Sequence, residues 1–289
     1  MNEPLREAER TLRPVEPDCL AAWRALVDAE REQVEALPDR PRPGDFYAPV
    51  AQRFRDDPRR RDDEALNLVL ELVEPGETWL DLGAGGGRFT LPIALHARRV
   101  FAVEPSQGMR EVLGEALDQE AIANVEVLDE RWPGPSHAPV ADVGFISHVG
   151  YDIADIGPFL DQLEAHSRRC CAALLYDRSP ISEFAPLWPA VHGRERVLLP
   201  GLRELVALLF ARGTPPALRT LTLEPRTYPD LEALQAAARR PLWVLEGTEQ
   251  DALLARAVGD LARPLAGGLA LSARSRTLGL AIWKPRRAA

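Results

Sequence analysis

The sequence contains few cysteines and lacks long hydrophobic runs. Its three cysteines are Cys19 and the adjacent pair Cys170 and Cys171, so neither a disulfide framework nor a CxxC metal or redox motif is available. The first twenty residues lack the apolar stretch of a signal peptide, and apolar runs such as 205–211 are far shorter than the ~20 residues that span a bilayer. We therefore expect a cytoplasmic protein without a membrane partner.

Basic charge is also scarce. The chain has 35 basic and 44 acidic side chains, a formal charge of -9, and Lys284 is its only lysine. In the run 53–63, five arginines alternate with four aspartates, so opposite charges largely cancel, as in a solvated linker. Such a chain has no basic field to attract a phosphate backbone, and its five histidines show no metal-ligand spacing. We therefore expect that the protein has no nucleic-acid partner and no metal site.

What the sequence does contain is a regular alternation of strand and helix patterns. The 289 residues are 46% apolar and 27% charged, the composition of a globular protein with a sizeable core. Strands are expected at 78–82, 100–103, 125–128, 140–146 and 171–176, with helices at 107–121 and 156–166 among them. This order predicts an α/β fold with a doubly wound, mostly parallel sheet.

The N-terminal part is expected to be a separate helical element. Residues 18–37 have apolar positions at helical spacing, and a segment rich in proline and arginine follows them. We assign 1–64 to an N-terminal helical extension or cap and 65–289 to a single domain.

The part after the fifth expected strand is less regular. Residues 178–217 hold six prolines and one expected helix, 202–211, which indicates a cap or substrate-binding insertion. Thr248 and Asp251 form a capping box that opens a helix to about 263. The segments 269–272 and 278–283 are expected to close the fold as an antiparallel hairpin.

The strongest motif is a strand that runs directly into glycines, from Trp79 to Arg88. Glycines let the backbone approach a nucleotide without Cβ clashes. The dinucleotide fingerprint requires a glycine where Arg88 stands, which opposes a nicotinamide oxidoreductase. The pattern that fits is acid-x-Gly-x-Gly-x-Gly, formed by Asp81, Gly83, Gly85 and Gly87.

This pattern resembles the class I S-adenosylmethionine-dependent methyltransferases, whose ligand carries an ammonium group. A carboxylate beside the loop suits such a cation and would repel a diphosphate. The resemblance covers 65–177 and the end of the fold. It implies a seven-stranded, mostly parallel sheet with an antiparallel C-terminal strand, an insertion after the fifth strand, and S-adenosyl-L-methionine as cofactor.

The resemblance also implies roles for residues at the other strand ends. Glu104 follows the second strand, about twenty residues after the first glycine, where a carboxylate accepts hydrogen bonds from ribose hydroxyls. Met109 is expected to pack on the adenine and Asp129 to accept from its amino group. Tyr47 belongs to a segment, 45–54, that resembles one folding over the methionine end of the cofactor, although simple helix packing explains it equally well. The full expected cofactor site is Tyr47, Asp81, Gly83, Ala84, Gly85, Gly87, Glu104, Pro105, Ser106, Met109, Asp129 and Ser147.

The chemistry is expected after the fourth strand, where open α/β sheets have their ligand crevice. His148 stands there, either as a general base or as a residue that only lines the cofactor site. Substrate contacts are expected from Tyr151, Arg178, Trp188 and His192, with packing as the alternative for the aromatic residues. The segment 147–150 lacks the Asn/Asp-Pro-Pro-aromatic motif of amino-methylating nucleic-acid enzymes.

These features together predict an enzyme that transfers a methyl group to the oxygen or nitrogen of a small molecule by in-line displacement. Two alternatives stay open. One is a catalytically silent protein that binds the cofactor as a sensor or scaffold, and the other is a methyltransferase for protein or RNA. The sequence leaves the oligomeric state undetermined.

Overall fold

A seven-stranded mixed sheet forms the centre of the protein. The computed structural model describes residues 14–37, 45, 47–135 and 137–286. The strands are β1 (Thr78–Leu82), β2 (Arg99–Val103), β3 (Val125–Leu128), β4 (Ala141–Ser147), β5 (Ser167–Tyr176), β6 (Ala217–Leu223) and β9 (Arg276–Trp283), in the spatial order β3-β2-β1-β4-β5-β9-β6. Strands β1 to β5 pair in parallel, and β9 pairs antiparallel with both β5 and β6. The predicted fold class is confirmed.

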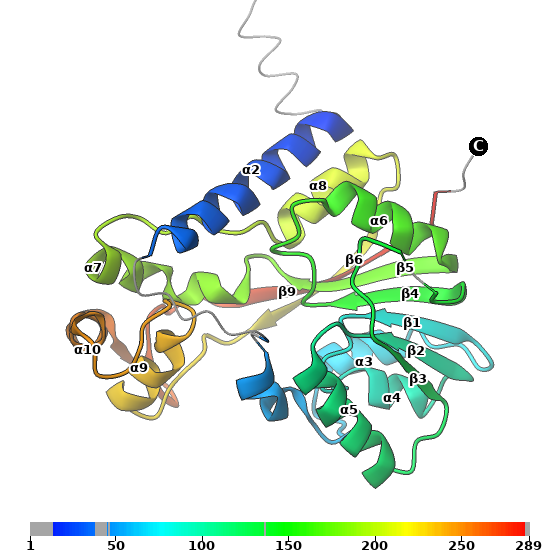
Figure 1. The fold of residues 1–289 in the computed structure, drawn as a ribbon, viewed down its shortest axis with the longest axis horizontal. Helices are drawn as coiled ribbons and strands as arrows, with labels where there is room; N and C mark the ends of the chain where they lie inside the picture. Colours follow the sequence, from blue (N-terminus) through cyan, green and yellow to red (C-terminus); the bar gives the residue numbers. More distant parts are fainter. Residues whose placement is uncertain (1–13, 38–44, 46, 136, 287–289) are drawn as a thin grey trace, which may run out of the picture.

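Helices cover both faces of this sheet (Figure 1). One face carries α2 (Glu16–Glu35), α6 (Ile156–Ala165) and α8 (Leu202–Ala211), and the other carries α3 (Glu64–Leu70), α4 (Thr90–Ala94) and α5 (Gln107–Gln119). Side chains of β1 alternate between these layers, as in any strand. Leu80 and Leu82 face the α2 side, whereas Trp79 packs in the cluster on the other side.

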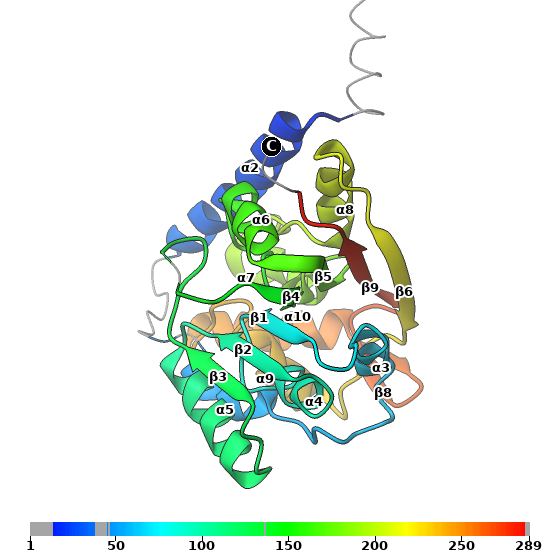
Figure 2. The same ribbon diagram turned by 90° about the vertical axis from the view of Figure 1, so that its right-hand side faces the viewer.

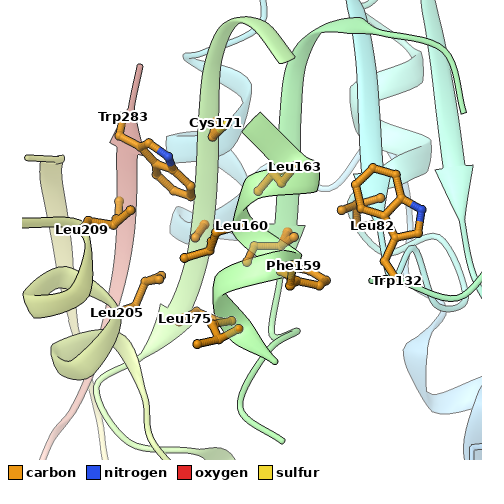
Figure 3. Packing of buried hydrophobic residues seen from close by; sticks show 14 of the residues in the cluster. Leu82, Trp132, Phe159, Leu160, Leu163, Cys171, Leu175, Leu205, Leu209 and Trp283 are labelled. Carbon is orange, nitrogen blue, oxygen red and sulfur yellow. The ribbon is translucent and has the colours of Figure 1, made fainter. Parts of the chain in front are cut away.

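The larger apolar cluster lies between the sheet and helices α6 and α8 (Figure 3). Leu160 and Leu163 of α6 pack there with Cys171 of β5 and Trp283 of β9, and all four are buried. Burying a leucine side chain contributes about 1.5–3 kcal/mol. This layer therefore fixes α6, and the chain that leads into it from β4, against the sheet.

A buried arginine joins the helices on the same face. Arg212 at the end of α8 has a fully buried side chain and forms ion pairs with Glu16 at 2.9 Å, Asp161 at 2.6 Å and Glu164 at 3.4 Å. Arg286 after β9 contacts the same three carboxylates. Ion pairs of two arginines with three carboxylates thus join α2, α6, α8 and the chain after β9.

A second, smaller body covers one end of the sheet, at the left of Figure 1. We call it the cap; it contains η2 (Pro180–Leu187), α7 (Trp188–His192), α9 (Leu231–Arg239), α10 (Glu249–Leu261) and the small sheet β7 (Arg263–Leu265) with β8 (Gly268–Ala270). The cap has its own apolar cluster and begins just after the C-terminal end of β5, so it stands beside the carboxyl ends of the parallel strands. No helix in the described ranges is long and apolar enough to cross a membrane.

The C-terminal part of the sheet differs from the prediction in one hairpin and in one additional strand. The predicted hairpin of 269–272 with 278–283 does not form, because β8 pairs with β7 while β9 inserts between β5 and β6. Strand β6, at the sheet edge in Figure 2, was not predicted because most of its side chains are exposed and give no buried alternation. Within the expected insertion, helix α8 packs on the sheet, and the cap draws its remaining helices from 231–261.

Candidate functional site

The glycine loop after β1 has the backbone conformation that its glycines predict. Gly83, Gly85 and Gly87 have φ values of +74°, +56° and +91°, in the left-handed region that favours glycine. A Cβ atom on Gly83 would lie 2.4 Å from Val149 Cγ2, so this glycine also makes room for the chain after β4. A Cβ on Gly85 would meet only Met109 Sδ, at 3.9 Å. The loop is therefore packed against the chain after β4 at Gly83, whereas Gly85 is in ordinary contact with Met109 and has room beside it.

Glu104 joins this loop to the end of β2. Its carboxylate is 6% exposed and accepts hydrogen bonds from the backbone N–H groups of Gly85 and Ser106, each at 2.8 Å. Burial raises the pKa of Glu104, and the two backbone bonds oppose that effect. Each carboxylate oxygen keeps a further lone pair, since an ionised carboxylate has about four acceptor positions. Glu104 can therefore accept hydrogen bonds from hydroxyl groups of a ligand beside the loop, and Pro105 links it to Ser106.

Asp81 lies deeper, under the loop. It is 2% exposed and accepts a hydrogen bond from Thr90 Oγ at 2.6 Å. Desolvation raises the pKa of Asp81 to about 7, with the nearby charge of Glu104 acting in the same direction. A cation bound beside Asp81 would favour its ionised form. The contact of Thr90 with Asp81 could not be predicted from the sequence, because it depends on how α4 packs against β1.

The start of α5 is held by two side chains. Ser106 Oγ accepts from the backbone N–H of Met109 at 3.2 Å and donates to Asp45 at 2.8 Å. Asp45 also accepts from the backbone N–H of Gly108 at 3.1 Å. A Cβ on Gly108 would lie 2.7 Å from Ala48 Cα, so this helix and the 45–54 segment are in backbone contact. Asp45 was not among the expected site residues, and its only signal in the sequence is its place in the 45–54 segment.

Tyr47 connects that segment with the cap. It precedes η1 (Ala48–Phe54), its ring meets Phe54 edge-on at 6.1 Å, and the Arg240 guanidinium at the end of α9 lies 5.6 Å from its centroid. Desolvation raises the pKa of Tyr47 to about 12, although the side chain is 43% exposed. Tyr47 is therefore a protonated phenol between Phe54 of η1 and Arg240 after α9.

Met109 and Asp129 occupy different environments. Met109 is buried in a small cluster with Ala51, next to the glycine loop. Asp129, after β3, is largely exposed and pairs with Arg110 at 2.8 Å, and the same guanidinium donates to the Glu104 carbonyl oxygen at 2.9 Å. Arg110, which was not among the expected site residues, thus links the ends of β2 and β3.

The chain after β4 places His148 at the carboxyl end of the sheet. Ser147 ends β4, and its buried Oγ has no hydrogen-bond partner among the described residues. His148 has a φ of +56°, and its ring stacks on Tyr176 of β5 with centroids 5.0 Å apart. Tyr151 is 6% exposed and its hydroxyl lies 3.4 Å from His148 Nδ1, so its place is structural.

The expected substrate residues in the insertion are not brought together. Trp188 is fully buried in the cap, with the Arg196 guanidinium 3.8 Å above its ring, and His192 is engaged with the Leu242 carbonyl oxygen at 2.8 Å. The expectation that these two side chains contact substrate is corrected, because both serve the packing of the cap. Arg178 is exposed just after β5. Within the described ranges, no group of three or more His, Cys, Asp or Glu side chains could hold a metal ion.

Solved structures share this architecture at low sequence identity. The YcgJ protein from Bacillus subtilis covers 78% of this chain and 99% of its own at a TM-score of 0.55, with 15% identity. A protein from Bacillus halodurans assigned as a methyltransferase covers 78% and 100% at a TM-score of 0.56, with 11% identity. These similarities establish the fold alone. No family model matches the chain.

Curated relatives match shorter parts of the sequence. A protein of Methanosphaera stadtmanae named "Probable ribosomal RNA small subunit methyltransferase A" is 35% identical over 71 residues, 24% of this chain and 26% of its own. A Pyrobaculum aerophilum protein of the same name is 31% identical over 107 residues, 37% and 43%. A 23S rRNA (uracil(1939)-C(5))-methyltransferase of Alkalilimnicola ehrlichii is 43% identical over 84 residues, 29% and 18%. The chain spans less than half the length of each of these relatives.

These names contradict one prediction. A small-molecule substrate without a nucleic-acid partner was expected from the acidic net charge and the missing motif after the fourth strand, and it is wrong, because the curated relatives are enzymes of ribosomal RNA. The resemblance read from the glycine loop is confirmed at the level of the fold. The chain therefore has the class I fold of the S-adenosylmethionine-dependent methyltransferases.

Proposed function

We propose that this protein binds S-adenosylmethionine at the glycine loop and transfers its methyl group to RNA. The observation that carries the cofactor assignment is the pair of buried carboxylates, Asp81 and Glu104, around the left-handed Gly85. Two acidic groups at one glycine loop suit a ligand that combines an ammonium with ribose hydroxyls, and they oppose a ligand with a diphosphate. Bound S-adenosylmethionine supplies a methyl group activated by its sulfonium.

In this proposal the residues around the glycine loop each bind one part of the cofactor. Glu104 accepts the ribose hydroxyls with the lone pairs that its two backbone bonds leave available. Asp81 faces the cationic part of the ligand, Met109 packs on the adenine, and Asp129 accepts from the adenine amino group while Arg110 holds it. Tyr47 closes the rim. Because methyl transfer is an in-line displacement, the protein mainly positions the two reactants.

RNA is the proposed acceptor because of the curated relatives and the local charge near the loop. Arg53 within η1 and Arg61 before α3 are exposed, and Arg88 of the glycine loop is half exposed and paired with Asp63 at 3.1 Å. Neither Arg53 nor Arg61 forms an ion pair with a described residue. Such side chains can contact phosphates without reading sequence.

The test is methyl incorporation from labelled S-adenosylmethionine into purified ribosomal RNA, with Glu104→Ala as the matched variant. We expect label in RNA with the wild type and loss of at least 90% with the variant. Calorimetry with S-adenosylhomocysteine and NADH separates the cofactor classes. Binding of NADH alone would refute the cofactor assignment, and binding of S-adenosylhomocysteine without RNA labelling would refute the acceptor.

A further inference from the structure

The Tyr151 hydroxyl lies between two groups of the candidate active site. Its oxygen accepts the backbone N–H of Tyr176 at 2.9 Å and lies 3.4 Å from His148 Nδ1. Burial raises the pKa of Tyr151, so the phenol keeps its hydrogen at neutral pH. Among the residues that the structure describes, His148 Nδ1 is the acceptor within reach of that hydrogen.

Two arrangements of the hydrogens are conceivable, and only one satisfies every group. If His148 carried its hydrogen on Nδ1, the Tyr151 oxygen would accept two bonds, and its own buried O–H would have no acceptor in the described chain. Leaving a buried polar group without a partner destabilises the folded state. If Tyr151 donates to Nδ1, the Tyr176 N–H, the phenol and Nδ1 are all paired. A neutral imidazole carries one N–H, which then belongs to Nε2.

The surroundings of His148 favour the neutral ring. Although His148 is exposed, desolvation by the chain around it lowers its pKa, with Arg88 acting in the same direction and Asp63 opposing it. The ring stacks on Tyr176, whose other contacts include the Arg276 guanidinium at 5.4 Å. The His148 backbone N–H donates to the Leu174 carbonyl oxygen at 3.0 Å, so the main chain that carries the ring is also fixed.

We propose that Tyr151 is a positioning residue that holds His148, which is exposed after β4, as a neutral imidazole with its hydrogen on Nε2, so that His148 donates a hydrogen bond to the methyl acceptor. This inference deepens the proposed function, on which its substrate side rests. It implies that the methylated substrate presents a hydrogen-bond acceptor to His148 Nε2, such as a nucleobase carbonyl oxygen or an unprotonated ring nitrogen. It also replaces the general-base role expected for His148, because the basic nitrogen is turned to Tyr151.

The direct test is ¹⁵N NMR of the full chain with labelled histidine, in which His148→Gln identifies the His148 signals. At pH 7 we expect Nε2 to have the shift of a protonated nitrogen and Nδ1 that of an unprotonated one. In Tyr151→Phe this preference should give way to a mixture of tautomers. Tyr228→Phe, which removes a buried phenol hydroxyl in the cap, is the matched control and should leave the His148 signals unchanged.

Protonated Nδ1 in the wild type, or an imidazolium at pH 7, would overturn the proposal even if Tyr151→Phe failed to fold. So would a folded Tyr151→Phe protein with unchanged tautomer. In the RNA assay, His148→Gln should retain at least ten times the turnover of His148→Ala, because the glutamine amide offers a donor near the place of Nε2, and equal loss would overturn the donor role. S-adenosylhomocysteine binding tests the proposed function separately, and the NMR result does not depend on it.

Discussion

Replacing Asp81 with asparagine should move protein stability and ligand affinity in opposite directions. The carboxyl group is 2% exposed, and its pKa is raised from 3.8 to about 7. The folded state therefore binds more protons than the unfolded state between about pH 4 and pH 7, so this group lowers stability as pH rises through that window. A pKa shift of about three units corresponds to a loss of at most about 4 kcal/mol in the free energy of unfolding. This loss is complete above pH 7 and absent below pH 4.

Asparagine removes this charge but keeps an oxygen that accepts from Thr90. We expect Asp81→Asn to raise the melting temperature at pH 8, by about 2–4 °C for each kcal/mol gained, and to have a much smaller effect at pH 5. Calorimetry at pH 8 should show S-adenosylhomocysteine binding weakened at least tenfold, because a charge-assisted contact to the ammonium is lost. A variant that melts earlier than the wild type at pH 8, or that binds the ligand equally well, would refute this account of Asp81.

Three further outcomes can be checked by calorimetry, limited proteolysis and thermal melting. Glu104→Ala should weaken S-adenosylhomocysteine binding at least tenfold, and unchanged affinity in the folded variant would mean that another residue carries the ribose. Gly108→Ala should push the 45–54 segment off α5 and increase its proteolysis, whereas Gly114→Ala, with open space at its Cβ, should be tolerated; equal behaviour of the two would contradict the backbone contact. Arg212→Met should cost about 1–3 kcal/mol, because the buried carboxylate of Glu164 loses one of its two arginine partners and keeps Arg286, against less than about 1 kcal/mol for the exposed pair of Arg24; a loss no larger than that for Arg24 would contradict the role of Arg212.

The sequence predicted the sheet well where strands are buried on both faces. β1 and β5 read as continuous apolar runs because helices cover them above and below. β6 could not be recognised in the same way, since it is an edge strand with mostly exposed side chains. The partner of β9 was then misassigned, because an antiparallel strand between β5 and β6 gives the same local pattern as one arm of a hairpin.

In the candidate site, too, residues placed by local sequence were predicted, and contacts between distant residues were not. The positions of Asp81, Gly85 and Glu104 follow from the ends of adjacent parallel strands, so local spacing was enough to place them together. Contacts such as Ser106 with Asp45 join residues 61 positions apart, and no local pattern encodes them. Trp188 shows the opposite error, since an aromatic residue in a proline-rich segment suggests a ligand contact until the cap that buries it is known.

Net charge misled the choice of acceptor for a physical reason. Screening limits the reach of a charge to about 8–10 Å at physiological salt, so an acceptor responds to the groups near the crevice and not to the whole chain. Much of the acidic charge is spent elsewhere: Glu16, Asp161 and Glu164 neutralise the arginines that join α2, α6 and α8. Near the glycine loop, exposed Arg53 and Arg61 have no such partner among the described residues. A formal charge of -9 is therefore compatible with an RNA-facing surface, and the sign of charge that decides binding is local.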